Sequence, residues 1–204
     1  MGTGDKRTHS GSHRRLLEIE QPPLGFRTVI PCDLDRHFSI RLSMADNDAS
    51  LRDNLVQLLR GGNAHVDVLS ALKDFPPKLF GAKPQSVPHS AWELLEHMRI
   101  ALRDLWEFST NDAYVEKKWP DDYWPKTAEP PSNEAWQNSV RALKEDLEAF
   151  EDLIKNPDSN LYAQIPWGKK DQTLLREFLL AADHNSYHTG ELVFLRRILG
   201  AWKG

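Results

Sequence analysis

The stretch Thr173–Trp202, TLLREFLLAADHNSYHTGELVFLRRILGAW, decides the fold of this chain of 204 residues. It is apolar nearly all round a helix, and such a helix must be buried among several neighbours. Its centre, DHNSYHTGEL, nevertheless carries two histidines and two acids. Polar groups inside a buried helix need partners, because an unpaired one costs free energy. The stretch therefore predicts a helical core with a polar site inside it.

Three further segments space their apolar residues as buried helices do. They lie at about 48–72, from Ser90 onward and at about 132–156. The first continues through Gly61-Gly62, where we expect a weak or kinked middle. Together with the last helix, at about 173–199, these segments predict an all-α fold, a four-helix bundle. The connection at 115–131 contains most of the aromatic stretch KKWPDDYWPKTAEPPSNE (117–134), and it is expected to pack over the core rather than to act as a flexible linker.

The first 45 residues are expected to form a poorly defined N-terminal extension, partly disordered or draped, ahead of a domain at 46–204. Residues 1–15 are polar and basic, which indicates a disordered end. Within residues 16–45, GFRTVI and HFSIRLSM show some alternation of apolar and polar positions. A short hairpin and a draped extended arm are both compatible with that pattern.

The composition narrows the classes of partner. The formal net charge of −4 gives no general reason to expect nucleic acid. The single cysteine, Cys32, excludes an internal disulfide and any zinc site with two thiolates. No apolar run is long enough to cross a membrane, and the first 30 residues lack the apolar centre of a signal peptide. We therefore expect a cytoplasmic protein that has neither nucleic acid nor a membrane as its partner.

The histidines of the last helix are the first candidate site. His184 and His188 are four residues apart, so they share one face of a helix. At that spacing two imidazoles can bind one metal ion. Asn185 stands where an HExxH protease would carry its catalytic glutamate, which disfavours that class of enzyme. A third ligand must come from another helix, and we expect it to be His97, with His65 as a further candidate.

Two acids lie within one helical turn of these histidines. Glu191 follows His188 by three residues, and Glu93 precedes His97 by four. Either carboxylate could act as a catalytic base or proton shuttle. For Glu191, a hydrogen bond that orients a ligating histidine is an equally good interpretation.

The chain resembles the DinB/YfiT-like superfamily over roughly residues 48–202. The resemblance is carried by PHSAWELLEHMRIALRDLWEFS, WPDDYWP, DQTLLREFLLAADHNSYHTGEL and LRRILGAW. The name is shared with a DNA polymerase, which this sequence does not resemble. The resemblance implies a metal-binding four-helix bundle of up-down-down-up order, with His97, His184 and His188 as ligands of zinc or nickel. It also implies relatives that include thiol-dependent transferases, isomerases and a few hydrolases.

Three imidazoles leave an open coordination position, which is typical of a catalytic rather than a structural metal site. Activation of a water or of a low-molecular-weight thiol at such a position would support hydrolysis or group transfer. We therefore expect a metal-dependent transferase or hydrolase that acts on a small molecule. The alternative is a non-catalytic, metal-stabilised bundle that acts in association, for instance as a homodimer, or in a stress response.

Overall fold

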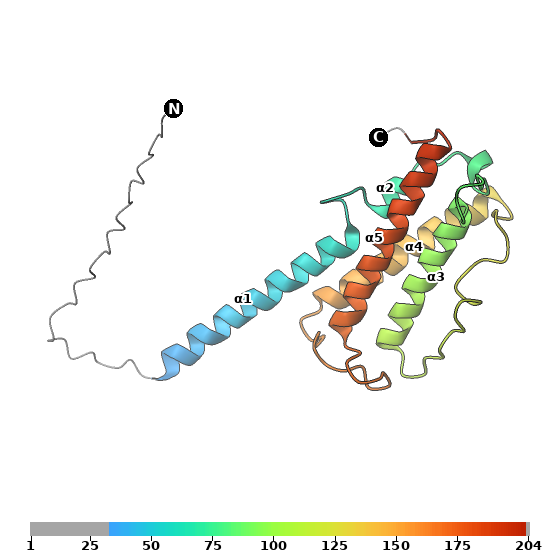
Figure 1. The fold of residues 1–204 in the computed structure, drawn as a ribbon. Helices are drawn as coiled ribbons and strands as arrows, with labels where there is room; N and C mark the ends of the chain where they lie inside the picture. The colour runs from blue at the N-terminus through green and yellow to red at the C-terminus, as the bar shows by residue number, and fades with distance from the viewer. Residues whose placement is uncertain (1–32, 203–204) are drawn as a thin grey trace, which may run out of the picture. The chain divides into compact units, whose positions relative to one another are not determined.

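A computed structural model of the protein describes residues 33–202, with side chains from residue 47 onward. This part of the chain is all-helical and contains no named strand. The elements, drawn in Figure 1, are α1 Asp33–Arg60, α2 Val68–Leu72, a 3₁₀ turn Pro77–Leu79, α3 Ala91–Thr110, α4 Asn133–Lys155 and α5 Leu174–Ile198. Within the described range, none of the helices is both long enough and apolar enough to cross a membrane.

The helices have the up-down-down-up order that the family resemblance implied. α3 packs against both α4 and α5. Arg103 of α3 meets Asp146 of α4, while Phe80, ahead of α3, stacks on Trp136 near the start of α4, so these two helices run in the same direction. The segment ahead of α5 meets the end of α3, where the Trp167 indole donates to the Phe108 carbonyl. His184 of α5 meets His97 further back in α3, so α5 runs antiparallel to α3.

The last turns of α1 run antiparallel to α4. Arg52 donates to the carbonyl oxygens of Ile154, Asn156 and Ser159, at and beyond the end of α4. Two turns later, Arg60 pairs with Glu151, further back along α4. Because carbonyls at a helix end have no partner within the helix, the buried Arg52 guanidinium acts as a cap that joins α1 to α4.

The expectation of one long helix at about 48–72 is wrong. α1 ends at Arg60, and Gly61 and Gly62 follow with φ of 70° and 88°. Residues with side chains rarely adopt this left-handed region, so the pair of glycines ends the helix instead of only weakening it. A new N-cap, Asp67, whose carboxylate accepts from the Ser70 amide, then starts the five-residue helix α2.

The described part of the N-terminal extension also differs from the expected hairpin or extended arm. Residues 33–45 belong to α1 instead of forming a hairpin or an extended arm. The remainder of the expected extension, including Cys32, lies outside the described residues.

The other three long helices begin within one residue of the starts expected from the sequence. Ser90 and Glu93 form a capping box at the start of α3, and the side chains of Ser132 and Thr173 cap α4 and α5. Each cap satisfies an amide that would otherwise lack a partner. The core between the helices includes these fully buried residues: Leu95, Met98, Leu143, Phe150, Phe178 and Leu192.

Glu151 links α1 and α4 in a way that should make stability depend on pH. Its buried carboxylate is held by Arg60 and Lys155, and the hydrogen bond from Arg60 holds the pKa of Glu151 below its usual value. A carboxyl with a lowered folded-state pKa binds more protons when unfolded, so it stabilises the fold at neutral pH and loses this effect in acid. We expect Glu151→Gln to lower the free energy of unfolding at pH 7 by roughly 0.5–1 kcal/mol, since Arg60 is exposed.

Urea denaturation at pH 7 and at pH 3 measures this effect. The difference between Glu151→Gln and the wild type should shrink at pH 3, whereas Glu148→Gln, at an exposed position of the same helix, should change little at either pH. A difference that stayed constant between the two pH values would contradict the expectation.

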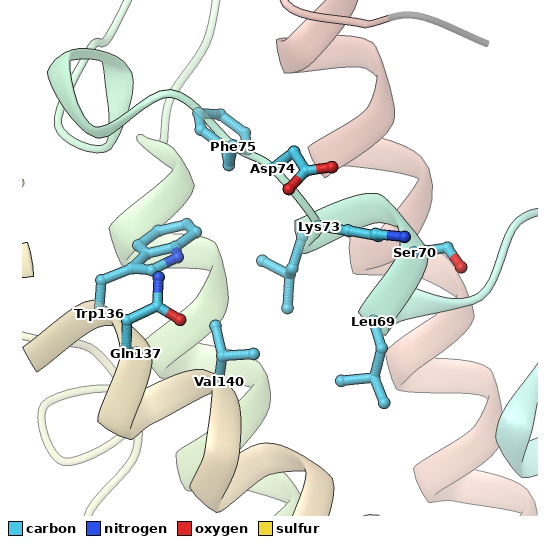
Figure 2. Close-up of a pocket in the computed structure, with 9 residues that line it drawn as sticks. Leu69, Ser70, Lys73, Asp74, Phe75, Trp136, Gln137 and Val140 are labelled. Atoms are coloured by element: carbon cyan, nitrogen blue, oxygen red, sulfur yellow. The ribbon is translucent and has the colours of Figure 1, made fainter. Parts of the chain in front are cut away.

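A hollow of about 440 Å³ lies between α2 and α4. Figure 2 shows Trp136, Gln137 and Val140 of α4 on one side of it and Leu69 of α2 on the other. None of the histidines lines this hollow. One wall of the hollow is formed by residues after the break in the expected long helix. The histidines that carry the predicted chemistry lie elsewhere in the bundle.

Candidate metal centre

Three histidines from two helices converge inside the bundle. His97 on α3 is 2% exposed and His188 on α5 is 8% exposed, while His184 is half-buried. One ring nitrogen of each lies within 4.8 Å of the others. The Nε2 atoms of His97 and His184 are 3.0 Å apart. The antiparallel pairing of α3 and α5 thus brings together residues that are 87 or more positions apart in sequence.

Hydrogen bonds fix the orientation of two of the rings. His97 Nδ1 donates to the main-chain carbonyl of Tyr123 at 2.9 Å, and His188 Nδ1 donates to Glu191 Oε2 at 2.7 Å. A carbonyl and a carboxylate can only accept, so each Nδ1 carries the proton and each Nε2 keeps a lone pair. This arrangement, in which an outer acceptor orients the ring, is the usual one for histidines that bind a metal.

The interior keeps the three rings neutral. Burial, followed by the charges that His188 and His97 would carry, lowers the pKa of His184 to about 4. Burial, followed by the charge that His97 would carry, likewise lowers the pKa of His188 to about 4. Burial also lowers the pKa of His97. At neutral pH all three are therefore unprotonated imidazoles, which is the form that binds metal ions.

The donor set fits a divalent cation. The lone pair of His97 Nε2 faces His184 Nε2 at 3.0 Å, a distance that requires a proton or a cation between the two nitrogens. Imidazole nitrogens that each lie about 2.0–2.1 Å from one zinc ion are about 3.3 Å apart at the tetrahedral angle. The spacing of His97 and His184 is therefore close to that of two ligands of one ion. The three-histidine cluster is compatible with metal binding.

Aromatic side chains of the connection 111–132 surround the cluster. Trp124 stacks on His97 with ring centres 3.9 Å apart and an angle of 1° between the ring planes. His89 stacks on Trp124 with ring centres 4.1 Å apart. Trp119 lies 6.4 Å from His97, and Tyr187 of α5 lies 4.9 Å from His188. The connection does pack over the core. Trp167, in contrast, contacts the end of α3 through its indole N–H.

Asp104 has a part in this site that its residue type alone does not indicate. Its buried carboxylate accepts hydrogen bonds from the hydroxyls of Tyr114 and Tyr123. Burial and the bond to Asp104 raise the pKa of Tyr123, so the phenol stays protonated as a donor. Because Tyr123 also supplies the carbonyl that holds His97, Asp104 anchors the loop that orients this ring.

The two candidate catalytic acids occupy different surroundings. Glu191 is one-third exposed and in direct contact with His188. The carboxylate of Glu93 is held by the Ser90 amide and by Lys83, as part of the capping box. A proton-transfer role for Glu93 would require these bonds to break. The role of either acid in catalysis stays a prediction.

His65 lies outside the cluster. It is exposed, and its Nδ1 and Nε2 are near the Val66 carbonyl and the Ser186 hydroxyl. The histidine cluster within the described residues consists of His97, His184 and His188 alone.

The fold and the cluster define a helical bundle that carries three converging imidazoles. The sequence profile of the DinB superfamily matches residues 63–192, nearly two thirds of the chain and including all three histidines. The protein therefore belongs to the DinB superfamily, which confirms the resemblance seen in the sequence. No match was found among curated proteins, and none among solved structures.

Proposed function

We propose that this protein is a cytoplasmic, metal-dependent enzyme of the DinB superfamily that acts on a small molecule. Its metal ligands are His97, His184 and His188, and zinc or nickel is the ion. The observation that carries the proposal is the convergence of three neutral imidazoles on one point. The partners are small molecules, with no nucleic acid and no membrane involved.

A divalent ion with three histidine ligands keeps an open position, where it can activate a water or the thiol of a small molecule. The protein's own residues supply orientation and shielding. Tyr123 and Glu191 hold the rings of His97 and His188, and Trp124 covers one face of His97. The partly exposed Glu191 is also the acid best placed to accept a proton from a bound reactant. A hydrolase and a thiol-dependent transferase both fit this arrangement.

The experiment that tests this function uses the full chain loaded with zinc, nickel or cobalt. Absorption of the cobalt(II) protein is recorded with and without a small thiol such as cysteine, because thiolate binding to cobalt adds an intense near-ultraviolet band. Turnover is then screened with ester substrates and with thiol–electrophile pairs. Metal-dependent turnover that is lost in His184→Ala supports an enzyme. Stoichiometric metal without turnover in either screen would count against one.

Replacement of Glu191 tests its contact with His188. Loss of an acceptor that orients a ligating histidine typically weakens metal affinity by about 10–100-fold. We expect Glu191→Gln to lower the metal affinity by a factor in this range, because the amide oxygen can still accept a weaker hydrogen bond. Glu191→Ala should lower the affinity further. Competition with a fluorescent zinc chelator measures the affinity. Glu107→Gln, on α3 beyond the cluster, serves as the control, and an unchanged affinity in Glu191→Ala would contradict the assignment.

A second candidate function, association as a homodimer, is favoured by one observation. Leu180, Tyr187, Phe194 and Ile198 are 39–65% exposed along α5. Their spacing of seven, seven and four residues places them on one stripe of the helix, as in a helix–helix seam. A paired α5 from a second copy would cover this stripe.

If α5 pairs in this way, the wild type should sediment as a dimer, and the double variant Leu180→Glu with Ile198→Glu should yield a folded monomer. A monomeric wild type would exclude a homodimer.

A further inference from the structure

A small pocket lies beside Glu191, apart from the three histidines. Its volume is about 160 Å³. It is formed by the segment ahead of α3, the first turn of α3 and the C-terminal half of α5. Its lining is mostly apolar and includes Val87, Pro88, His89, Leu94, Glu191 and Phe194. No lysine or arginine is among the residues that line it.

This pocket lies next to the histidine cluster along α3 and α5. Leu94 precedes His97 on α3, and Glu191 follows His188 on α5, each by three residues. Three residues correspond to about 4.5 Å along a helix. Because α3 and α5 are antiparallel, both steps lead in the same direction away from the cluster. Glu191 contacts both the cluster and the pocket, because its Oε2 accepts a hydrogen bond from His188 while the side chain lines the pocket.

A second wall connects the pocket to the cluster. His89 lines the pocket and stacks on Trp124, which in turn stacks on His97. One stack of rings, formed by His89, Trp124 and His97, therefore joins the wall of the pocket to the cluster.

We infer that the pocket is a subsite for a short, uncharged aliphatic or aryl substituent of the substrate. Its volume sets the size, because an apolar cavity of about 150 Å³ accommodates a benzene ring, which has six carbons. Its lining sets the polarity: apolar walls favour a hydrocarbon group, and the Glu191 carboxylate at the inner end repels an anionic one. The substrate class is thus a small molecule with a metal-binding polar group and a tail of up to about six carbons.

This inference rests on the proposed metal site, and a series of hydroxamates separates the two. Acetohydroxamate binds a metal ion through its two oxygens and has almost no tail, so it reports the metal site alone. Butano-, hexano- and octanohydroxamate add methylenes. Binding to the zinc-loaded full chain is measured by calorimetry. We expect affinity to rise about fourfold for each methylene up to about six carbons, and then to level off.

Two variants locate the tail. Val87→Trp at the half-exposed rim should fill the pocket and remove the chain-length dependence, while metal content and acetohydroxamate affinity stay unchanged. Val115→Trp, at a valine that is 80% exposed, is the matched control and should behave as the wild type. Phe194→Ala, at another exposed position, should extend the preference to longer tails.

The possible failures are distinct. Absence of bound metal, or of acetohydroxamate binding, would overturn the proposed function and the subsite with it. Acetohydroxamate binding with no gain from longer tails would overturn the subsite alone. A chain-length dependence that survived in Val87→Trp would also overturn it, because the tail would then lie elsewhere.

Discussion

Replacement of His184 by alanine should abolish stoichiometric metal binding. The residue supplies one of three converging nitrogens, and its Nε2 is 3.0 Å from that of His97. Removing it leaves two imidazoles for the ion, so the loss should exceed the roughly 100-fold that an outer hydrogen-bond partner contributes. The same result is expected for His97→Ala and His188→Ala. Elemental analysis of dialysed protein measures the metal content directly.

The matched control is His65→Ala, because His65 is a histidine of the same protein that lies outside the cluster. It should retain the full complement of metal. Circular dichroism shows whether each variant keeps its helices, so that loss of metal is not confused with loss of fold. One metal ion per chain retained by folded His184→Ala would show that the cluster is not the binding site.

Arg196→Ala should strongly destabilise the fold. The buried guanidinium of Arg196 donates to the carbonyl oxygens of Ala71, Lys73 and Ala201, which ties α5 to the end of α2 and to the C-terminal segment. It also packs over the rings of Phe75 and Trp202 at 5.1 and 5.3 Å. Hydrogen bonds to a charged donor contribute about 1.5–3 kcal/mol each, partly offset by the burial of the cation.

We therefore expect Arg196→Ala to lower the free energy of unfolding by about 3 kcal/mol. Urea denaturation followed by circular dichroism measures it. Arg197→Ala is the control, since the neighbouring arginine is exposed on the same helix. Arg196→Lys should recover only part of the stability, because an ammonium cannot reach three carbonyls in the fixed geometry of a guanidinium. Equal stability of the two alanine variants would contradict this role.

The helices and the histidine cluster were accessible from sequence because both depend on periodicity. The spacing of His184 and His188 determines that they share a face, and the capping box at Ser90 fixes where the helix carrying His97 begins. The packing of that helix against α5 then brings the three rings together. His97 was already the expected third residue from the sequence, with His65 as a further candidate, and the family resemblance supported His97.

What the sequence left unresolved depends on the backbone. The pair Gly61-Gly62 is compatible with a kink or a stop, and only the positive φ angles distinguish the two. The carbonyl of Tyr123 that holds His97 is present in every residue type, so no pattern of side chains points to it. In HFSIRLSM the alternation of a strand and the spacing of a helix coexist over a short run, and residues 33–45 prove to be helical.

The face-to-face contact between Trp124 and His97 makes the site optically visible. Indole emission responds to a change of charge on a ring stacked 3.9 Å away, and binding of a cation at His97 is such a change. Comparison of the wild type with Trp124→Phe separates this signal from that of the other tryptophans. Occupancy of the centre can thus be titrated in solution by intrinsic fluorescence, with no added dye and before any substrate is known.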